Sequence, residues 1–218
     1  MRRLGLPALA FVLIAAGGYV GLAVAPREEF MGDVYRIMFV HVPAAWAAMA
    51  AFFASFAASV WYLIRRDPRA DALAETGAEV GVVFSTLLLI TGSLWGRPTW
   101  GVWWTWDPRL TSAAIMWLAY SIYLALRRLV RVPEQRAGWS AVVGVVIFVD
   151  IPIVRASVNW WSSIHQVRST VSTLDPSILR ALYLNGAAYL VLLVWFMQLR
   201  YAIARRRSGL AARAPVAG

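Results

Sequence analysis

Six apolar runs occupy most of this 218-residue chain, each close to the length of about 20 residues that crosses a bilayer as a helix. A crossing segment has to satisfy its own backbone hydrogen bonds, which predicts an all-helical bundle. The composition agrees, with 61% hydrophobic residues and a mean hydropathy of +0.63. We therefore predict an all-α polytopic membrane protein with six transmembrane helices. The predicted spans are about Leu4–Val24, Pro43–Ile64, Leu73–Leu94, Ser112–Leu126, Trp139–Val154 and Ile178–Leu199, of which the fourth and fifth are short.

The distribution of arginine predicts the orientation of these spans. All 21 basic residues are arginine. If the N-terminus is cytoplasmic, fourteen arginines fall on the cytoplasmic side and seven on the outer side, as the positive-inside rule expects. Both termini are then cytoplasmic, and the net charge of +10 reflects membrane topology and not nucleic-acid binding. The outer arginines are Arg27, Arg36, Arg97, Arg109, Arg155, Arg168 and Arg180.

The sequence has room for one compact unit. We expect residues 1–205 to form a single six-helix domain and residues 206–218, which are basic and rich in Ala and Gly, to form a disordered cytoplasmic tail. The start of the chain also has the pattern of a signal peptide, but its apolar part is longer than usual, which favours an uncleaved first helix. Because the chain has no cysteine, disulfide exchange and iron–sulfur clusters are excluded within it.

Residues 95–111 connect the third and fourth runs and contain five of the twelve tryptophans: Trp95, Trp100, Trp103, Trp104 and Trp106. Tryptophan favours the membrane–water boundary, so this connection lies at the rim of the bilayer. An ordinary aromatic belt and a platform for a large planar ligand both remain open. The i, i+3, i+4 spacing of Trp100, Trp103 and Trp104 predicts one face of a short surface helix, limited to about two turns by Pro98 and Gly101.

The only two histidines, His41 and His165, both fall on the outer side, at the depth of the tryptophan-rich connection. Each has tryptophan close by in the sequence. Two unrelated interfacial histidines would explain this pattern, but two neutral imidazoles could also take the axial positions of one haem iron. Two nitrogens alone make a poor zinc site, because zinc usually takes four ligands, or three and a water.

Three charged residues near this rim are further candidates. Arg36 lies five residues before His41 and could pair with a carboxylate of a bound ligand. Asp107 is expected to cap the fourth helix and could pair with Arg109. Asp150 lies within the fifth apolar run, where an acid is costly and suggests a function by default, although a pairing with Arg155 would also explain it.

The tryptophan-rich connection resembles the "WWD" signature of haem-handling membrane proteins. His-Val-Pro-Ala-Ala-Trp around His41 and Trp-Trp-Ser-Ser-Ile-His-Gln around His165 are similar to one branch, the cytochrome c maturation protein C or haem exporter protein C family. The resemblance covers nearly the whole chain. It implies that His41 and His165 are the axial ligands of haem b. It also implies that the remaining contacts to haem come from Trp95, Gly96, Trp100, Trp103, Trp104, Trp106 and Asp107.

The same resemblance implies a function without catalytic residues. A protein of this family binds haem transiently at the outer face of the bacterial cytoplasmic membrane and presents it to a membrane-anchored haem chaperone. An ABC-type ATPase with its permease subunits and a small single-helix protein are the other implied partners. Two alternatives stay open: a permease subunit that moves haem or another solute, and a redox enzyme with a permanent haem.

Overall fold

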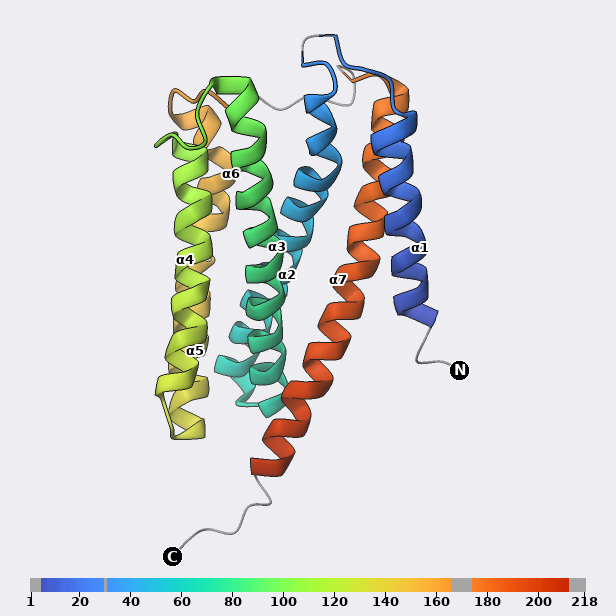
Figure 1. The fold of residues 1–218 in the computed structure, drawn as a ribbon. Helices are drawn as coiled ribbons and strands as arrows, with labels where there is room; N and C mark the ends of the chain where they lie inside the picture. Colours follow the sequence, from blue (N-terminus) through green and yellow to red (C-terminus); the bar gives the residue numbers. More distant parts are fainter. Residues whose placement is uncertain (1–4, 30, 166–173, 212–218) are drawn as a thin grey trace, which may run out of the picture.

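The structure, a computed structural model, describes residues 5–29, 31–165 and 174–211, and its named elements are all helices joined by non-helical connections. Most helices lie side by side along one direction (Figure 1). Six helical stretches are long and apolar enough to cross a membrane, which confirms the predicted fold class. The segments are α1 (Gly5–Tyr19), the π-helix η1 (Val20–Val24), the 3₁₀-helix η2 (Val34–Ile37), α2 (Met38–Arg65), α3 (Pro68–Trp100), α4 (Pro108–Leu129), α5 (Pro133–Ile147), α6 (Asp150–Trp160) and α7 (Pro176–Ala211).

Proline marks where four of these helices begin, and Pro176 is the first residue of α7. Pro68, Pro108 and Pro133 occupy the first turn of α3, α4 and α5, where a missing backbone N–H costs nothing. Asp67 and Asp107 precede two of them as N-caps, and their carboxylates accept hydrogen bonds from the backbone two residues later. The chain therefore turns sharply between neighbouring helices.

The fifth span is divided into two helices. Residues 148 and 149 form a turn between α5 and α6, although the apolar run is continuous in the sequence. The physical reason is Pro152, which has no N–H to donate to the carbonyl of Phe148 and whose ring would clash with it. Asp150 is thereby placed at the first residue of α6.

Small residues bring α2 and α3 into close contact. Ala44, Ala47 and Ala51 on α2 are almost fully buried. A Cβ at Gly77 would lie 2.7 Å from the carbonyl oxygen of Ala51, so the two backbones touch. Such close packing holds helices together in a bilayer, where burial of apolar surface adds little. Phe52 extends this core by stacking on Tyr120 of α4, with ring centroids 3.8 Å apart.

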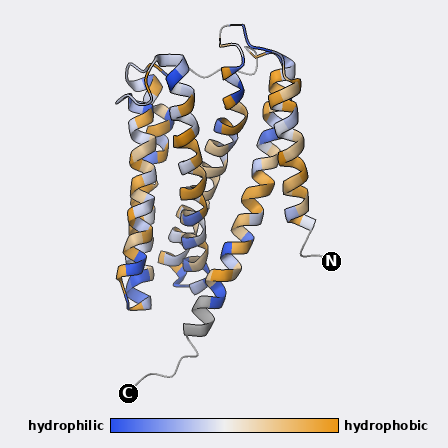
Figure 2. Ribbon diagram, viewed as in Figure 1, coloured by the Kyte–Doolittle hydropathy of each residue, from blue (hydrophilic) through white to orange (hydrophobic). Residues whose placement is uncertain are grey.

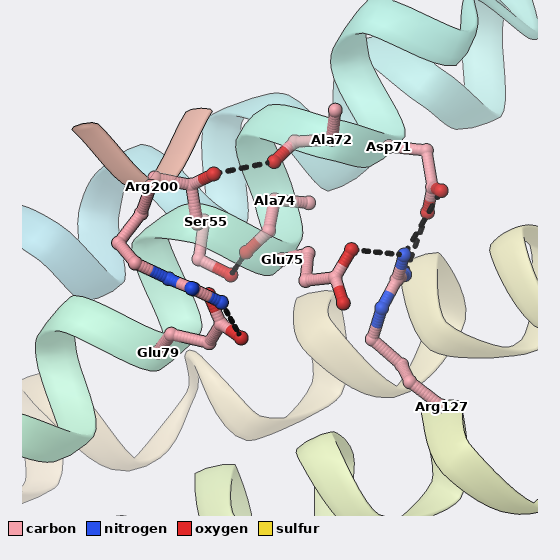
Figure 3. Close-up of polar contacts among 9 residues, drawn as sticks. Ser55, Asp71, Ala72, Ala74, Glu75, Glu79, Arg127 and Arg200 are labelled. Atoms are coloured by element: carbon pink, nitrogen blue, oxygen red, sulfur yellow. Dashed lines mark hydrogen bonds and ion pairs between the residues drawn. The ribbon is translucent and has the colours of Figure 1, made fainter. Parts of the chain in front are cut away.

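The opposite end of the bundle from the tryptophan-rich connection is held by ion pairs from α3 to α4 and α7 (Figure 3). The Arg127 guanidinium donates to both carboxylate oxygens of Asp71, at 2.6 and 2.9 Å, and to Glu75 at 3.2 Å. Arg200 of α7 donates to Glu79 at 2.7 Å. Hydrophilic residues collect at this end and at the opposite rim, with apolar helix between them (Figure 2).

The predicted tail is described in part. Helix α7 continues to Ala211 and so enters the region expected to be disordered, while residues 212–218 lie outside the described residues, as does Arg168. The division into a domain and a tail stays a prediction.

Candidate functional site

His41 lies in the first turn of α2 and packs against the last turns of α3. Its Nδ1 is 3.1 Å from Oγ1 of Thr91. The imidazole and the indole of Trp95 pack edge to face, with ring centroids 5.7 Å apart and an interplanar angle of 81°. Gly92 makes room for the ring, since a Cβ there would lie 3.2 Å from the His41 Cε1. One helix, α3, thus supplies the contacts that hold His41.

His165 follows α6 and lies against the end of the same helix. Its ring centroid is 5.9 Å from that of Trp100, with an interplanar angle of 57°. The Nη1 of Arg109 lies 3.4 Å from the His165 Nδ1. A guanidinium only donates, so the His165 Nδ1 is the acceptor, and the neutral ring has its proton on Nε2.

Asp107 connects the start of α4 to the His165 segment. One carboxylate oxygen accepts from the backbone N–H of Arg109 at 2.9 Å, and the other accepts from the N–H of Ile164 at 2.9 Å. Burial alone would raise the pKa of Asp107, but hydrogen bonds from the Ser163 hydroxyl and from these backbone groups outweigh it and lower the pKa. The predicted cap is confirmed, and Asp107 meets Arg109 through the backbone.

Both imidazoles lie against the last turns of α3, His41 against Trp95 and His165 against Trp100. Trp95 and Trp100, the indoles that contact them, are five residues apart on α3, a rise of about 7.5 Å. The indole N–H of Trp95 is buried and has no hydrogen-bond partner among the described residues. Two imidazoles, aromatic walls and a buried donor without an acceptor would suit a planar metalloporphyrin with carboxylate groups.

The remaining tryptophans do not continue this helix. The predicted short surface helix is wrong: α3 runs through Pro98 to Trp100, and residues 101–106 are not helical. Gly101 ends the helix because its φ of +80° is the left-handed conformation that glycine adopts without strain. Trp103 and Trp106 are 57% and 82% exposed, so these indoles project from the rim.

Trp104 and Gly96 complete the tryptophan-rich connection. The ring of Trp104 stands nearly perpendicular to that of Trp106, with centroids 6.0 Å apart. Gly96 is buried, and a Cβ there would lie 3.1 Å from the Trp100 ring and 3.3 Å from the Val102 carbonyl oxygen. The glycine therefore permits the close approach of Trp100 and of the chain that follows it.

Two charged candidates have their own local contacts. Arg36 lies in η2, where its Nε donates to Asp33 at 3.0 Å and its Nη1 donates to the Gly21 carbonyl at 2.9 Å. Asp150 has one buried carboxylate oxygen without a hydrogen-bond partner among the described residues. In the described part of the chain, no group of three or more His, Cys, Asp or Glu side chains is arranged to hold a metal ion.

Sequence reasoning alone missed several residues of this site: Thr91, Gly92, Ser163 and the contact of Arg109 with His165. Helical spacing could have identified Thr91 and Gly92, because they precede Trp95 by four and three residues and so share its face of α3. The contacts of Ser163 and Arg109 depend on how a loop folds back over the rim, and no periodicity predicts that.

The chain matches the protein family described as heme exporter protein C over residues 4–214. It is 40% identical over 206 residues to the heme exporter protein C of Bradyrhizobium diazoefficiens, which covers 92% of this chain and 78% of that protein. It is 34% identical over 176 residues to that of Escherichia coli K12, covering 78% and 71%. A putative cytochrome c biosynthesis ccmC-like mitochondrial protein of Marchantia polymorpha is 37% identical over 166 residues, covering 76% and 70%. The chain belongs to the heme exporter protein C family, a family of multi-pass membrane proteins that handle haem in c-type cytochrome maturation.

Proposed function

We propose that this chain binds haem b at the outer rim of the bacterial cytoplasmic membrane and delivers it to a membrane-anchored haem chaperone. His41 and His165 provide the two axial nitrogens, and the indoles of α3 line the site. The observation that supports this most directly is that the chain's only two histidines each lie against a tryptophan of one helix end.

The two histidines differ in which ring nitrogen is available to a ligand. The Nδ1 of His41 is engaged by Thr91, which leaves Nε2 as its remaining ring nitrogen. His165 has its Nδ1 engaged by Arg109, and its neutral ring is protonated on Nε2. His165 therefore has to change tautomer and separate from Arg109 before its Nε2 becomes a ligand. A ligand carboxylate that attracts the guanidinium would release it.

A site of this kind suits transfer more than permanent binding. Both histidines lie near the ends of spans, and Trp103 and Trp106 are exposed on the connection that follows α3. The rim is accessible to a partner in the plane of the membrane. The partners we propose are the haem chaperone, an ABC-type ATPase with its permease subunits, and a small single-helix protein, as the family resemblance implies.

The test is the haem content of purified variants. We expect His41→Ala and His165→Ala each to lose most bound haem and to change the Soret band, while Ser162→Ala, on the same loop, retains both. A second measurement, transfer of haem from the wild-type protein to apo-chaperone in detergent, separates delivery from permanent binding. Unchanged haem content in both histidine variants would contradict the ligand assignment.

A further inference from the structure

Thr91 occupies a position that the proposed haem site does not yet explain. It lies on α3, one turn before Trp95, and is 8% exposed. Its Oγ1 is 2.7 Å from the carbonyl oxygen of Leu87, 3.2 Å from that of Leu88 and 3.1 Å from the His41 Nδ1. A threonine in a membrane helix commonly bonds only to its own helix, so the contact with His41 requires a separate account.

The direction of the hydrogen bonds with Leu87 and His41 follows from proton counting. The hydroxyl has one proton, and the Leu87 carbonyl can only accept. Two oxygens 2.7 Å apart need that proton between them, so Thr91 donates to Leu87. The contact with His41 then requires the imidazole to donate, and the Leu88 carbonyl lies beside the same ring as a second acceptor. Nδ1 of His41 is protonated, and Nε2 holds the lone pair.

We propose that Thr91 is a positioning residue for His41. Its hydroxyl oxygen accepts the Nδ1 proton and holds the ring in the one tautomer and orientation that present an unprotonated Nε2 to an incoming iron. This inference rests on the proposed function, in which His41 is a haem ligand. It goes beyond that function by assigning a role to a residue that does not contact the haem.

Such an acceptor has two consequences for a metal ligand. It removes the entropic and tautomeric cost of preparing the ring, which increases affinity. It also makes the imidazole a stronger electron donor, because the shared Nδ1 proton gives the ring partial negative charge. A stronger donor stabilises ferric over ferrous iron, so Thr91 lowers the midpoint potential of the bound haem.

The chain contains a matched control. Thr86, five residues earlier on α3, donates from Oγ1 to the carbonyl of Val82 at 2.7 Å and accepts from the indole Nε1 of Trp117 at 2.8 Å. The two threonines thus have the same arrangement on the same helix, but only Thr91 receives a proton from a histidine. Thr86→Val removes an equivalent hydroxyl without touching His41.

The first measurement is made on haem-free, full-length protein. Nitrogen-15 NMR of labelled histidine reports the tautomers of only two rings, and His165→Ala identifies the His41 signals. We expect Nδ1–H for His41 in the wild type, in Thr91→Ser and in Thr86→Val. Thr91→Val should shift the ring toward the Nε2–H form. A wild-type His41 protonated on Nε2, or a Thr91→Val variant that keeps Nδ1–H, overturns the proposal.

The second measurement is made with haem bound. We expect Thr91→Val to weaken haem binding by about tenfold or more and to raise the midpoint potential, with Thr91→Ser close to wild type. A changed tautomer with unchanged affinity and potential also overturns the proposal. Retention of haem by His41→Ala would instead overturn the ligand assignment, and because a different variant reports it, the two failures are distinguishable.

Discussion

At the scale of single residues, the site depends on which atom of each side chain is already engaged. The two histidines are chemically identical, yet Thr91 accepts from one and Arg109 donates to the other. Asp107 is as important to the arrangement as either histidine. It caps α4 with one oxygen and receives the backbone of the His165 segment with the other. Removing a single acceptor therefore affects parts of the chain far apart in sequence.

Asp107 should make the stability of the protein depend on pH in the acid range. Its pKa is lowered in the folded state, so its stabilising effect is complete above its ordinary pKa of 3.8 and is lost as the pH falls through the folded value. Thermal unfolding in detergent, measured against pH, should show this loss in the wild type. In Asp107→Asn the loss of stability at acid pH should be smaller than in the wild type, because this position then has no carboxylate to protonate. Identical pH profiles would show that the carboxylate does not hold the loop.

Gly96→Ala should disturb the site through contact alone. The added Cβ would lie 3.1 Å from the Trp100 ring, and relieving it moves Trp100 away from His165. Overpacking of this kind costs about 1–3 kcal/mol. We expect a lower unfolding temperature and weaker haem binding. Gly138→Ala in α5 is the control, since its Cβ meets only Arg66 at 3.5 Å; equal effects of the two substitutions would contradict the prediction.

At the scale of elements, α3 joins the two ends of the molecule. It is one helix of 33 residues from Pro68 to Trp100. Its first turns hold Arg127 and Arg200 through three carboxylates, and its last turns hold both histidines. Because one continuous helix carries both, the ion pairs at one end help to fix the position of the tryptophans at the other end.

Arg127→Ala should be strongly destabilising. The arginine side chain is 3% exposed, and its partners Asp71 and Glu75 are 16% and 30% exposed, so the substitution leaves two partly buried carboxylates without this partner. Breaking a buried pair in this way costs about 3–5 kcal/mol. The neighbouring Arg128→Ala, at an exposed position, should change stability by only about 0.5 kcal/mol. Thermal unfolding in detergent compares the two, and a small effect at Arg127 would show that solvent reaches the pair.

At the scale of the whole molecule, the chain crosses the bundle six times. The start of α1 and the end of α7 therefore lie toward the same end of the bundle (Figure 1). His41 lies near the start of the second span and His165 follows the fifth, and both are at the opposite end of the bundle because four crossings separate them. The arginine distribution predicts that the end with the histidines faces away from the cytoplasm.

The absence of cysteine makes this topology directly testable, because any introduced cysteine is unique. Val102→Cys and Ser162→Cys lie at exposed positions of the rim, and Arg131→Cys lies at an exposed position of the other end. In sealed spheroplasts, a membrane-impermeant maleimide should label the first two and leave the third unlabelled until the membrane is permeabilised. Labelling of positions 102 and 162 on opposite faces would exclude a shared site.

The sequence by itself determined the fold class, the number of spans, the placement of both histidines at one end of the bundle and the cap at Asp107. These features follow from local rules: apolar length against bilayer thickness, the interfacial preference of tryptophan, and the fit of Asp-Pro to a helix start. Only the tertiary structure decided the continuation of α3 to Trp100, the division of the fifth span, and the partners of each imidazole. Those depend on contacts between segments distant in sequence, such as Thr91 with His41 and Arg109 with His165, and the energy of such a contact is absent until the helices pack.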